Sequence, residues 1–269
     1  MAPDRTATVH LPPSAASPQA EAVLGAIRSL TENVGAPHLL SELAPAAFYS
    51  QHHLHRLFLQ HTRTTPGRFL TALRMQAAKE LLAETAMTVS RISDEIGYQS
   101  IGSFTTQFSR LVGISPGRFR ELVDTTAGHR ITDPDLERAL PGDSSGIACS
   151  LEASCGAGSL TGRVTFVGLF GADLPQGRLA GFGMLRESSG VVLDRRGGAG
   201  GGDMFTMSLP DSLDLARLAV GGSGDMLVGR GSVPGGPDRR AALALRLPNA
   251  FDPPVVSAAP AIHLREFLR

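Results

Sequence analysis

The sequence predicts a multidomain α plus β protein, with an all-α domain over 18–124 and an antiparallel β-sandwich over 147–269. Two patterns support this division. Apolar residues recur at helical spacing in the first stretch, whereas short apolar runs bounded by glycine and proline make up the second. A length of 269 residues accommodates two domains of ordinary size, and a hydrophobic fraction of 42% is enough to build a core. A third observation, a repeat within the first stretch, indicates how its helices are organised.

Cap residues and prolines divide the N-terminal stretch into expected helices. Residues 1–17 are expected to form a disordered lead, and Ser17 with Pro18 begins the first helix because a serine cap followed by proline is a typical start. A short second helix carries Leu39, Leu40 and Leu43. The remaining helices follow Ser50, Thr65, Thr88, Ser100 and Ser115, and the longest extends from 66 to 84.

The pentapeptide TPGRF at 65–69 returns as SPGRF at 115–119, and its neighbours repeat in register. An offset of fifty residues pairs Ser50 with Ser100, Leu54 with Phe104 and Phe58 with Phe108, and upstream the offset becomes forty-nine. Each copy therefore has a short helix, a tight turn, a capped helix, a loop and a proline-started helix. A short helix, a tight turn and a second capped helix form a helix-turn-helix, so the sequence predicts two such units.

The helix over 66–84 separates the two units. Nineteen residues span about 28 Å at 1.5 Å per residue, close to the ~34 Å of one DNA turn. The two second helices can therefore enter successive major grooves on one face of a duplex. The net formal charge of the chain is zero, but 44–120 holds nine Arg or Lys against four Asp or Glu, the sign that phosphate binding requires.

Several motifs make the resemblance to a known family specific. They are IGY at 96–98, phenylalanines four residues apart at 104 and 108, and GISPGRFR at 113–120. With these, 22–122 resembles the DNA-binding domain of the AraC/XylS transcription regulators, a homeodomain-like pair of helix-turn-helix units. The first unit departs from the family, since its turn reads AAFYS at 46–50 where glycine is usual. The resemblance implies a sequence-specific DNA-binding transcription factor without enzymatic activity, and it leaves activation or repression open.

The outer faces of the two capped helices supply the residues expected to contact bases. The family positions map onto His52, His55 and Arg56 in the first helix and onto Ile101, Gly102, Ser103 and Thr106 in the second. Arg56 can bond a guanine in bidentate fashion, and Gln51 can do the same with adenine. The second helix offers no long polar side chain, so the first unit is expected to provide most of the discrimination. The alternative for each polar member is a solvated surface side chain.

Arginines near these helices are expected to bind phosphates. The set comprises Arg68, Arg74, Arg110 and Arg118. Arg68 and Arg118 fall in first helical turns, where each side chain can also pack over the preceding helix. The histidines of the region, His38, His52, His53, His55 and His61, do not form the ligand set of a catalytic zinc site, so no metal and no cofactor is expected.

Residues 125–146 are expected to be a linker, and the chain beyond them an effector-sensing or interaction domain. The runs VTFVGLF at 164–170 and LALRLP at 243–248 resemble strands of small transthyretin-type or carboxypeptidase-regulatory β-sandwiches. Cys149 and Cys155 are expected to be reduced thiols. One alternative is a regulator–enzyme fusion, for which a Cys155 of low pKa would be a sign. Another is a domain that only scaffolds a protein partner.

No run approaches the ~18 apolar residues of a membrane span, and the first residues lack a signal-peptide pattern. A cytoplasmic protein without membrane contact is therefore expected. The expected partners are double-stranded DNA, RNA polymerase and a small-molecule effector bound by the C-terminal domain.

Overall fold

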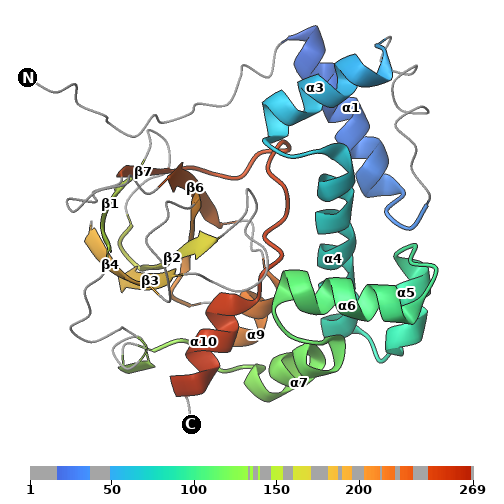
Figure 1. The fold of residues 1–269 in the computed structure, drawn as a ribbon. Coiled ribbons are helices and arrows are strands. Elements are labelled where there is room, and N and C mark those ends of the chain that lie inside the picture. The colour runs from blue at the N-terminus through green and yellow to red at the C-terminus, as the bar shows by residue number, and fades with distance from the viewer. Residues whose placement is uncertain are drawn as a thin grey trace, which may run out of the picture. The chain divides into compact units, whose positions relative to one another are not determined.

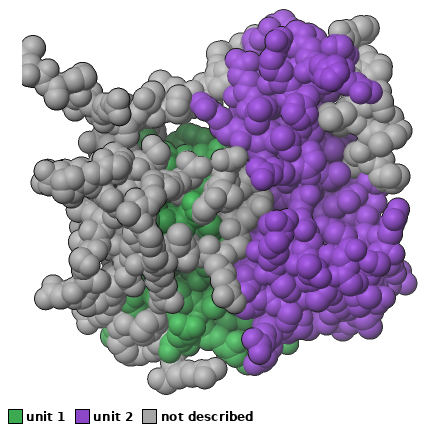
Figure 2. All heavy atoms as spheres, viewed as in Figure 1, with its two compact units in different colours: residues 1–10, 122–248, 257–269 green, residues 11–121, 249–256 purple. Residues whose placement is uncertain are grey.

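The computed structural model describes residues 17–36, 49–132, 134–135, 139, 147–153, 160–170, 181–186, 190–195, 203–212, 214–221, 225–232 and 242–267 (Figure 1). The chain divides into two compact units. The helical unit comprises Leu11–Glu121 and Asn249–Val256, and the β unit comprises Met1–His10, Leu122–Pro248 and Ser257–Arg269 (Figure 2). A segment close to the C-terminus thus belongs to the helical unit, an assignment that no local sequence pattern indicates.

Helices of the helical unit begin where the sequence predicts. Five start residues accept a hydrogen bond on the side-chain oxygen from the main-chain N–H three residues later: Ser17, Ser50, Thr65, Thr88 and Ser100. Each such bond satisfies a donor that the first helical turn leaves free. The helices are α1 (Pro18–Glu32), α3 (Gln51–Thr62), α4 (Pro66–Glu84), α5 (Val89–Glu95), α6 (Ile101–Val112) and α7 (Pro116–Thr126). These predicted starts are confirmed, and the helix expected around Leu39 lies outside the described residues.

The long helix α4 carries α1 and α3 near one end and α5 and α6 near the other (Figure 1). At the first end, Val23, Phe58 and Phe69 share one apolar cluster. At the second end, four rings contact one another in succession at centroid distances of 5.6, 5.6 and 5.7 Å: Tyr98, Phe104, Phe108 and Phe119. Each helix pair is therefore held by its own buried apolar surface, the main stabilising contribution to such packing.

Two glycines bring the turn after α1 against the turn between α5 and α6. A Cβ on Gly97 would lie 2.2 Å from the carbonyl oxygen of Gly35, and a Cβ on Gly35 would lie 2.4 Å from that of Glu95. Gly97 also has a φ of +79°, a conformation that costs glycine little and other residues considerably more. The two turns can approach this closely only because neither position has a side chain.

The β unit contains one sheet of seven strands in the order β6-β5-β2-β3-β4-β1-β7. The strands are β1 (Ile147–Ala153), β2 (Arg163–Phe170), β3 (Gly181–Arg186), β4 (Gly190–Arg195), β5 (Asp203–Pro210), β6 (Leu227–Ser232) and β7 (Ala242–Leu245). The β1–β7 pair is parallel and the other pairs are antiparallel. The sheet curls until its two edges meet: Val228 of β6 and Arg246, which directly follows β7, exchange main-chain hydrogen bonds of 2.8 and 3.0 Å.

This closed sheet differs from the predicted antiparallel sandwich. The α plus β composition and the C-terminal, mainly antiparallel sheet are confirmed, but the described strands form one curled sheet with a parallel pair. Gly229 shows why closure is possible, since a Cβ there would lie 2.9 Å from the carbonyl oxygen of Ala244 on the opposite edge. Strand length and turn spacing are alike in sandwiches and curled sheets, so the sequence pattern does not distinguish them.

Two short helices, α9 (Leu215–Val220) and α10 (Ala259–Phe267), complete the described part of the β unit. They pack against each other. The ring of His263 on α10 lies 4.4 Å, centroid to centroid, from that of Phe182 on β3. Among the described helices of the whole chain, none is both long enough and apolar enough to cross a bilayer.

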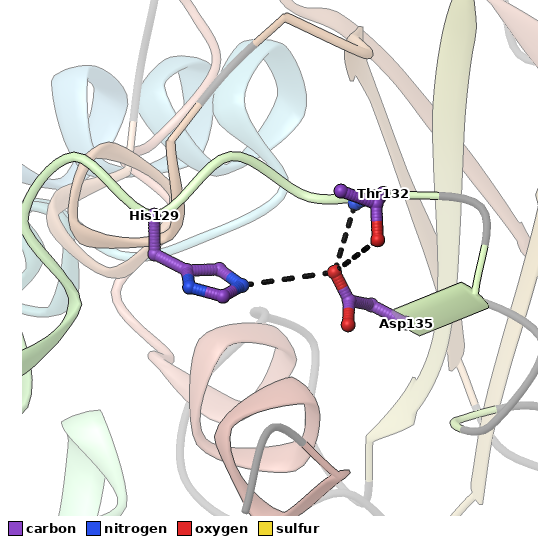
Figure 3. A network of polar contacts seen from close by, with 3 residues as sticks. All are labelled: His129, Thr132 and Asp135. Carbon is purple, nitrogen blue, oxygen red and sulfur yellow. Dashed lines mark hydrogen bonds and ion pairs between the residues drawn. The ribbon is translucent and has the colours of Figure 1, made fainter.

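The segment predicted as a linker is ordered where it is described, around Asp135 (Figure 3). Its Oδ2 accepts hydrogen bonds from the main-chain N–H of Thr132, at 3.0 Å, and from the hydroxyl of Thr132, at 2.5 Å. The same oxygen lies 3.6 Å from Nε2 of His129. The main-chain carbonyl of His129 accepts a 2.9 Å hydrogen bond from the N–H of Leu215, at the start of α9. This part of the segment is thereby tied to the β unit.

Candidate nucleic-acid interface

Helix α3 presents a polar outer face. Its N-terminus is fixed by Ser50, whose Oγ accepts a 3.3 Å hydrogen bond from the main-chain N–H of His53. Leu54, Leu57 and Phe58 are buried, and this burial sets the rotation of the helix about its axis. The residues predicted to contact bases then lie on the opposite side: Gln51, His52 and Arg56 are exposed and His55 is half-buried.

Helix α6 has the same construction with different chemistry. The Oγ of Ser100 accepts a 3.2 Å hydrogen bond from the main-chain N–H of Ser103, and Phe104, Phe108 and Leu111 are buried. The predicted base-contacting residues Ile101, Gly102, Ser103 and Thr106 are all exposed. Among the described residues, Ile101 is one of three large apolar side chains left in solvent, with 48% of its surface exposed. Such a side chain suits contact with a thymine methyl group.

Three of the four arginines predicted to bind phosphates are exposed: Arg68, Arg110 and Arg118. Arg68 and Arg118 lie in the first turns of α4 and α7, where their main-chain N–H groups donate to the hydroxyls of Thr65 and Ser115. Helix N-termini attract anions, so these two side chains lie where a phosphate is favoured. Arg110, near the end of α6, donates a 3.0 Å hydrogen bond to Oε1 of Gln107.

Arg74 has a different role from the one predicted. Its Nε and Nη2 donate 3.0 Å hydrogen bonds to the carbonyl oxygens of Val34 and Ala36, and its guanidinium carbon lies 5.7 Å from the ring centroid of Tyr98. Burial lowers the pKa of Arg74 and raises that of Tyr98. Arg74 therefore ties the turn after α1 to α4 and to Tyr98 between α5 and α6, and these donors are engaged within the unit.

Arg120 makes a comparable clamp that the sequence analysis did not identify. Its guanidinium donates to the carbonyl oxygens of Leu82, Thr85 and Met87 at 3.2, 3.4 and 2.6 Å. These carbonyls end α4 and precede α5, so Arg120 fixes the path between the two. A signal was present, because Arg120 is the last residue of the GISPGRFR motif.

His61 is the most buried of the described histidines near α3, with 8% of its surface exposed. Its Nδ1 has no hydrogen-bond partner, and burial lowers its pKa. A neutral ring packed among apolar groups is consistent with both observations. Within the described part of the chain, no three His, Cys, Asp or Glu side chains lie close enough together to hold a metal ion. Cys155 lies outside the described residues.

These two exposed, capped helices fall within one recognised domain. Residues 43–122 match the helix-turn-helix domain family. An uncharacterized HTH-type transcriptional regulator from Haemophilus influenzae is 38% identical over 84 residues, which are 31% of this chain and 28% of the relative. The HTH-type transcriptional regulator Rv1931c from Mycobacterium tuberculosis is 36% identical over 87 residues, 32% of this chain and 34% of the relative. The chain thus spans about a third of the length of these relatives.

One solved structure with a similar helical domain is that of a transcriptional regulator (AraC-type DNA-binding domain-containing proteins) from Chromobacterium violaceum. It is 25% identical, and the similarity covers 38% of this chain and 90% of that chain with a TM-score of 0.36.

Proposed function

We propose that this protein is an AraC-type transcription regulator that binds double-stranded DNA through two helix-turn-helix units. One observation carries the proposal: within 43–122, which matches the helix-turn-helix domain, two serine-capped helices at opposite ends of α4 keep their outer faces exposed. The major groove of DNA admits an α-helix, and a helix-turn-helix places its second helix there. The AraC-like motifs around 96–98 and 113–120 add independent support.

The length of α4 suits binding to successive grooves. Its nineteen residues extend about 28 Å, and the helices it separates need an offset of roughly 34 Å to enter grooves one turn apart. Gly35, Gly97 and Arg74 hold the two ends of the unit together by direct contact. A rigid pair of this kind can bind without large rearrangement, which reduces the ordering cost of association.

The outer faces of α3 and α6 contribute unequally to base recognition in this proposal. Helix α3 reads bases with Gln51, His52, His55 and Arg56, and α6 contributes apolar and short polar contacts from Ile101, Gly102, Ser103 and Thr106. Arg68, Arg110 and Arg118 bind phosphates. Bidentate Arg and Gln pairs discriminate bases more strongly than apolar contacts do, so α3 supplies most of the sequence preference.

The β unit is proposed to sense a small-molecule effector or to contact RNA polymerase or another protein. The helix-turn-helix match ends at residue 122, which leaves the curled sheet available for such a role.

Selection from a random pool of duplex DNA tests the proposal. The full-length protein is expected to enrich a site with a well-defined half bound by α3 and a less restricted, A·T-preferring half bound by α6. Repeating the selection with Arg56→Ala should relax the preference at one base pair of the defined half. Failure to enrich any sequence would contradict DNA reading altogether, and an unchanged site with Arg56→Ala would remove Arg56 from the reading residues.

A further inference from the structure

The segment Asn249–Val256, here called the strap, belongs to the helical unit although it follows β7 in the chain. More than a hundred residues separate it from α7. In Figure 1 it is part of the orange-red trace that passes beside α4. A passive connection between β7 and α10 would leave its side chains in solvent. The strap is not such a connection, because Phe251 and the carbonyl oxygens of Val255 and Val256 contact helices of the helical unit.

A tight turn at the beginning of the strap presents Phe251. The main-chain N–H of Asn249 donates to Oδ2 of Asp252 at 2.8 Å. In return, Asn249 accepts two hydrogen bonds: its Oδ1 from the N–H of Phe251 at 2.9 Å, and its carbonyl oxygen from the N–H of Asp252 at 3.0 Å. Asparagine and aspartate commonly close turns through such side-chain bonds. The conformation of the turn is therefore fixed by hydrogen bonds among its own residues and does not depend on the helices.

The ring of Phe251 fills a place in the core of the helical unit. Only 6% of its surface is exposed, and it belongs to one apolar cluster with Val23 of α1, Phe58 of α3 and Phe69 of α4. The ring centroid also lies 5.2 Å from that of His61, the buried histidine of α3. Removing a side chain in this position leaves a cavity where three helices meet.

The strap makes a second contact at Lys79, in the second half of α4. Nζ of Lys79 is fully buried and donates hydrogen bonds to the carbonyl oxygens of Val255 and Val256, at 3.1 and 3.3 Å. Lys79 is the only lysine in the chain, and the other 24 residues of the Lys and Arg total are arginines. An amine can lose its proton on burial whereas a guanidinium cannot, so lysine suits this site and arginine does not. Burial lowers the pKa of Lys79 to about 7.

We propose that the strap couples the two units: it completes the core formed by α1, α3 and α4, and so ties the position of α3 to the chain between β7 and α10. The coupling is one-sided. Phe251 joins the cluster beneath α3, whereas the core beneath α6 is built from Tyr98, Phe104, Phe108 and Phe119. A change in the β unit that pulls on the strap therefore acts directly on the first helix-turn-helix, and reaches the second only through α4 and the contacts of Gly35, Gly97 and Arg74. The coupling itself does not depend on the proposed function; only the role of α3 in reading DNA rests on it.

Hydrogen–deuterium exchange of the full-length protein tests the strap without DNA. The variant is Phe251→Ala, and the matched control is Phe182→Ala, which removes an equally buried phenylalanine that also contacts a histidine ring, but in the β unit. Phe251→Ala is expected to accelerate exchange in α1, α3 and the first half of α4 by roughly tenfold or more, and to leave α6 unchanged. Phe182→Ala should accelerate β2 and β3 and leave α1 and α3 as in the parent.

A milder variant keeps the test decisive if Phe251→Ala fails to fold. Phe251→Leu preserves most of the apolar volume and is expected to accelerate the same α1 and α3 peptides by a smaller factor. Exchange in α1 and α3 that stays at the parent rate with Phe251→Ala, or with Phe251→Leu where the alanine variant does not fold, overturns the coupling, as does equal acceleration of α3 and α6. Since no DNA is present, these outcomes are separate from failure of the DNA selection, which overturns only the proposed function.

Discussion

The two regions around α3 and α6 share their construction and differ in the residues that complete their apolar cores. Both second helices start at a serine cap and bury an aromatic stripe, and both leave an outer face exposed. In the second region Tyr98, Phe104, Phe108 and Phe119 contact one another in succession, whereas the core of the first region includes Phe251 from far along the chain. An internal repeat of sequence therefore does not produce two equivalent structural units. The copy with the more polar outer face is also the one whose core contains Phe251.

The largest loss of stability is predicted for a substitution at Gly97, in the turn between α5 and α6. Gly97→Ala places a methyl group 2.2 Å from the carbonyl oxygen of Gly35 and imposes a left-handed conformation on alanine, so it should lower the free energy of unfolding by about 3 kcal/mol or more. Chemical denaturation followed by circular dichroism measures the change. The matched control is Gly102→Ala, where no atom lies within 4 Å of the added Cβ, and stability should hold or rise slightly. Equal stability of the two variants would contradict the close approach of the two turns.

A second prediction concerns the strap and pH. The pKa of Lys79 is lowered from 10.5 to about 7 by burial, the effect of Glu80 being opposite and smaller. Between pH 7 and 10.5 the unfolded chain then holds a proton that the folded protein has released, so stability rises with pH and is lost as the pH falls towards 7. The free energy of unfolding should increase by roughly 2 kcal/mol from pH 7 to pH 9 through this group.

The variant Lys79→Met identifies the source of that dependence. Urea denaturation at pH 6, 7, 8 and 9 should show a rise for the parent above pH 7 and a nearly flat profile for the variant over the same range. Parallel profiles for the two proteins would show that Lys79 titrates outside this window.

The third prediction concerns the outer faces. Arg56→Ala should weaken binding to the selected site by about 1–3 kcal/mol, because it removes a bidentate contact, whereas Thr106→Ala on α6 should cost less than about 1 kcal/mol. Fluorescence anisotropy titrations at a fixed salt concentration compare the two. A larger loss with Thr106→Ala would reverse the assignment of α3 as the main reader.

The smallest effects concern the two caps. Ser50→Ala and Ser100→Ala each remove one acceptor of similar geometry, at 3.3 and 3.2 Å, and each should cost about 1 kcal/mol of stability. Thermal or chemical denaturation of the pair measures whether the two helix starts are equivalent. A difference of more than about 1 kcal/mol would show that the similarity of the two regions does not extend to their caps.

Local features of the molecule were predictable from sequence and distant ones were not. Helix starts at Ser50, Thr65 and Ser100 follow from capping within one turn, and the exposed faces follow from the helical period. The role of Arg74 was not predictable, because its acceptors lie about forty residues earlier in the chain. The insertion of Phe251 depends on a contact across an even longer separation, and helical or strand periodicity carries no information about such partners.

The curled sheet illustrates the same limit within the β unit. The runs at 164–170 and 243–248 were recognisable as strands and correspond to β2 and β7, and the buried run of β2 matches its place between β5 and β3. Its closure depends on Val228 meeting Arg246 and on the parallel pairing of a four-residue strand, β7. Both features depend on which strand pairs with which, and local amino-acid composition does not determine that pairing.

In the proposed binding mode, α3 and α6 occupy successive major grooves along one duplex. Hydroxyl-radical footprinting of the full-length protein on its selected site measures this most directly. The expected result is two protected tracts on one face of the DNA, with centres roughly 10 base pairs apart, and loss of protection at the α3 tract first when Arg56 is replaced by alanine. A single tract, or two tracts on opposite faces of the duplex, would contradict the proposed binding mode.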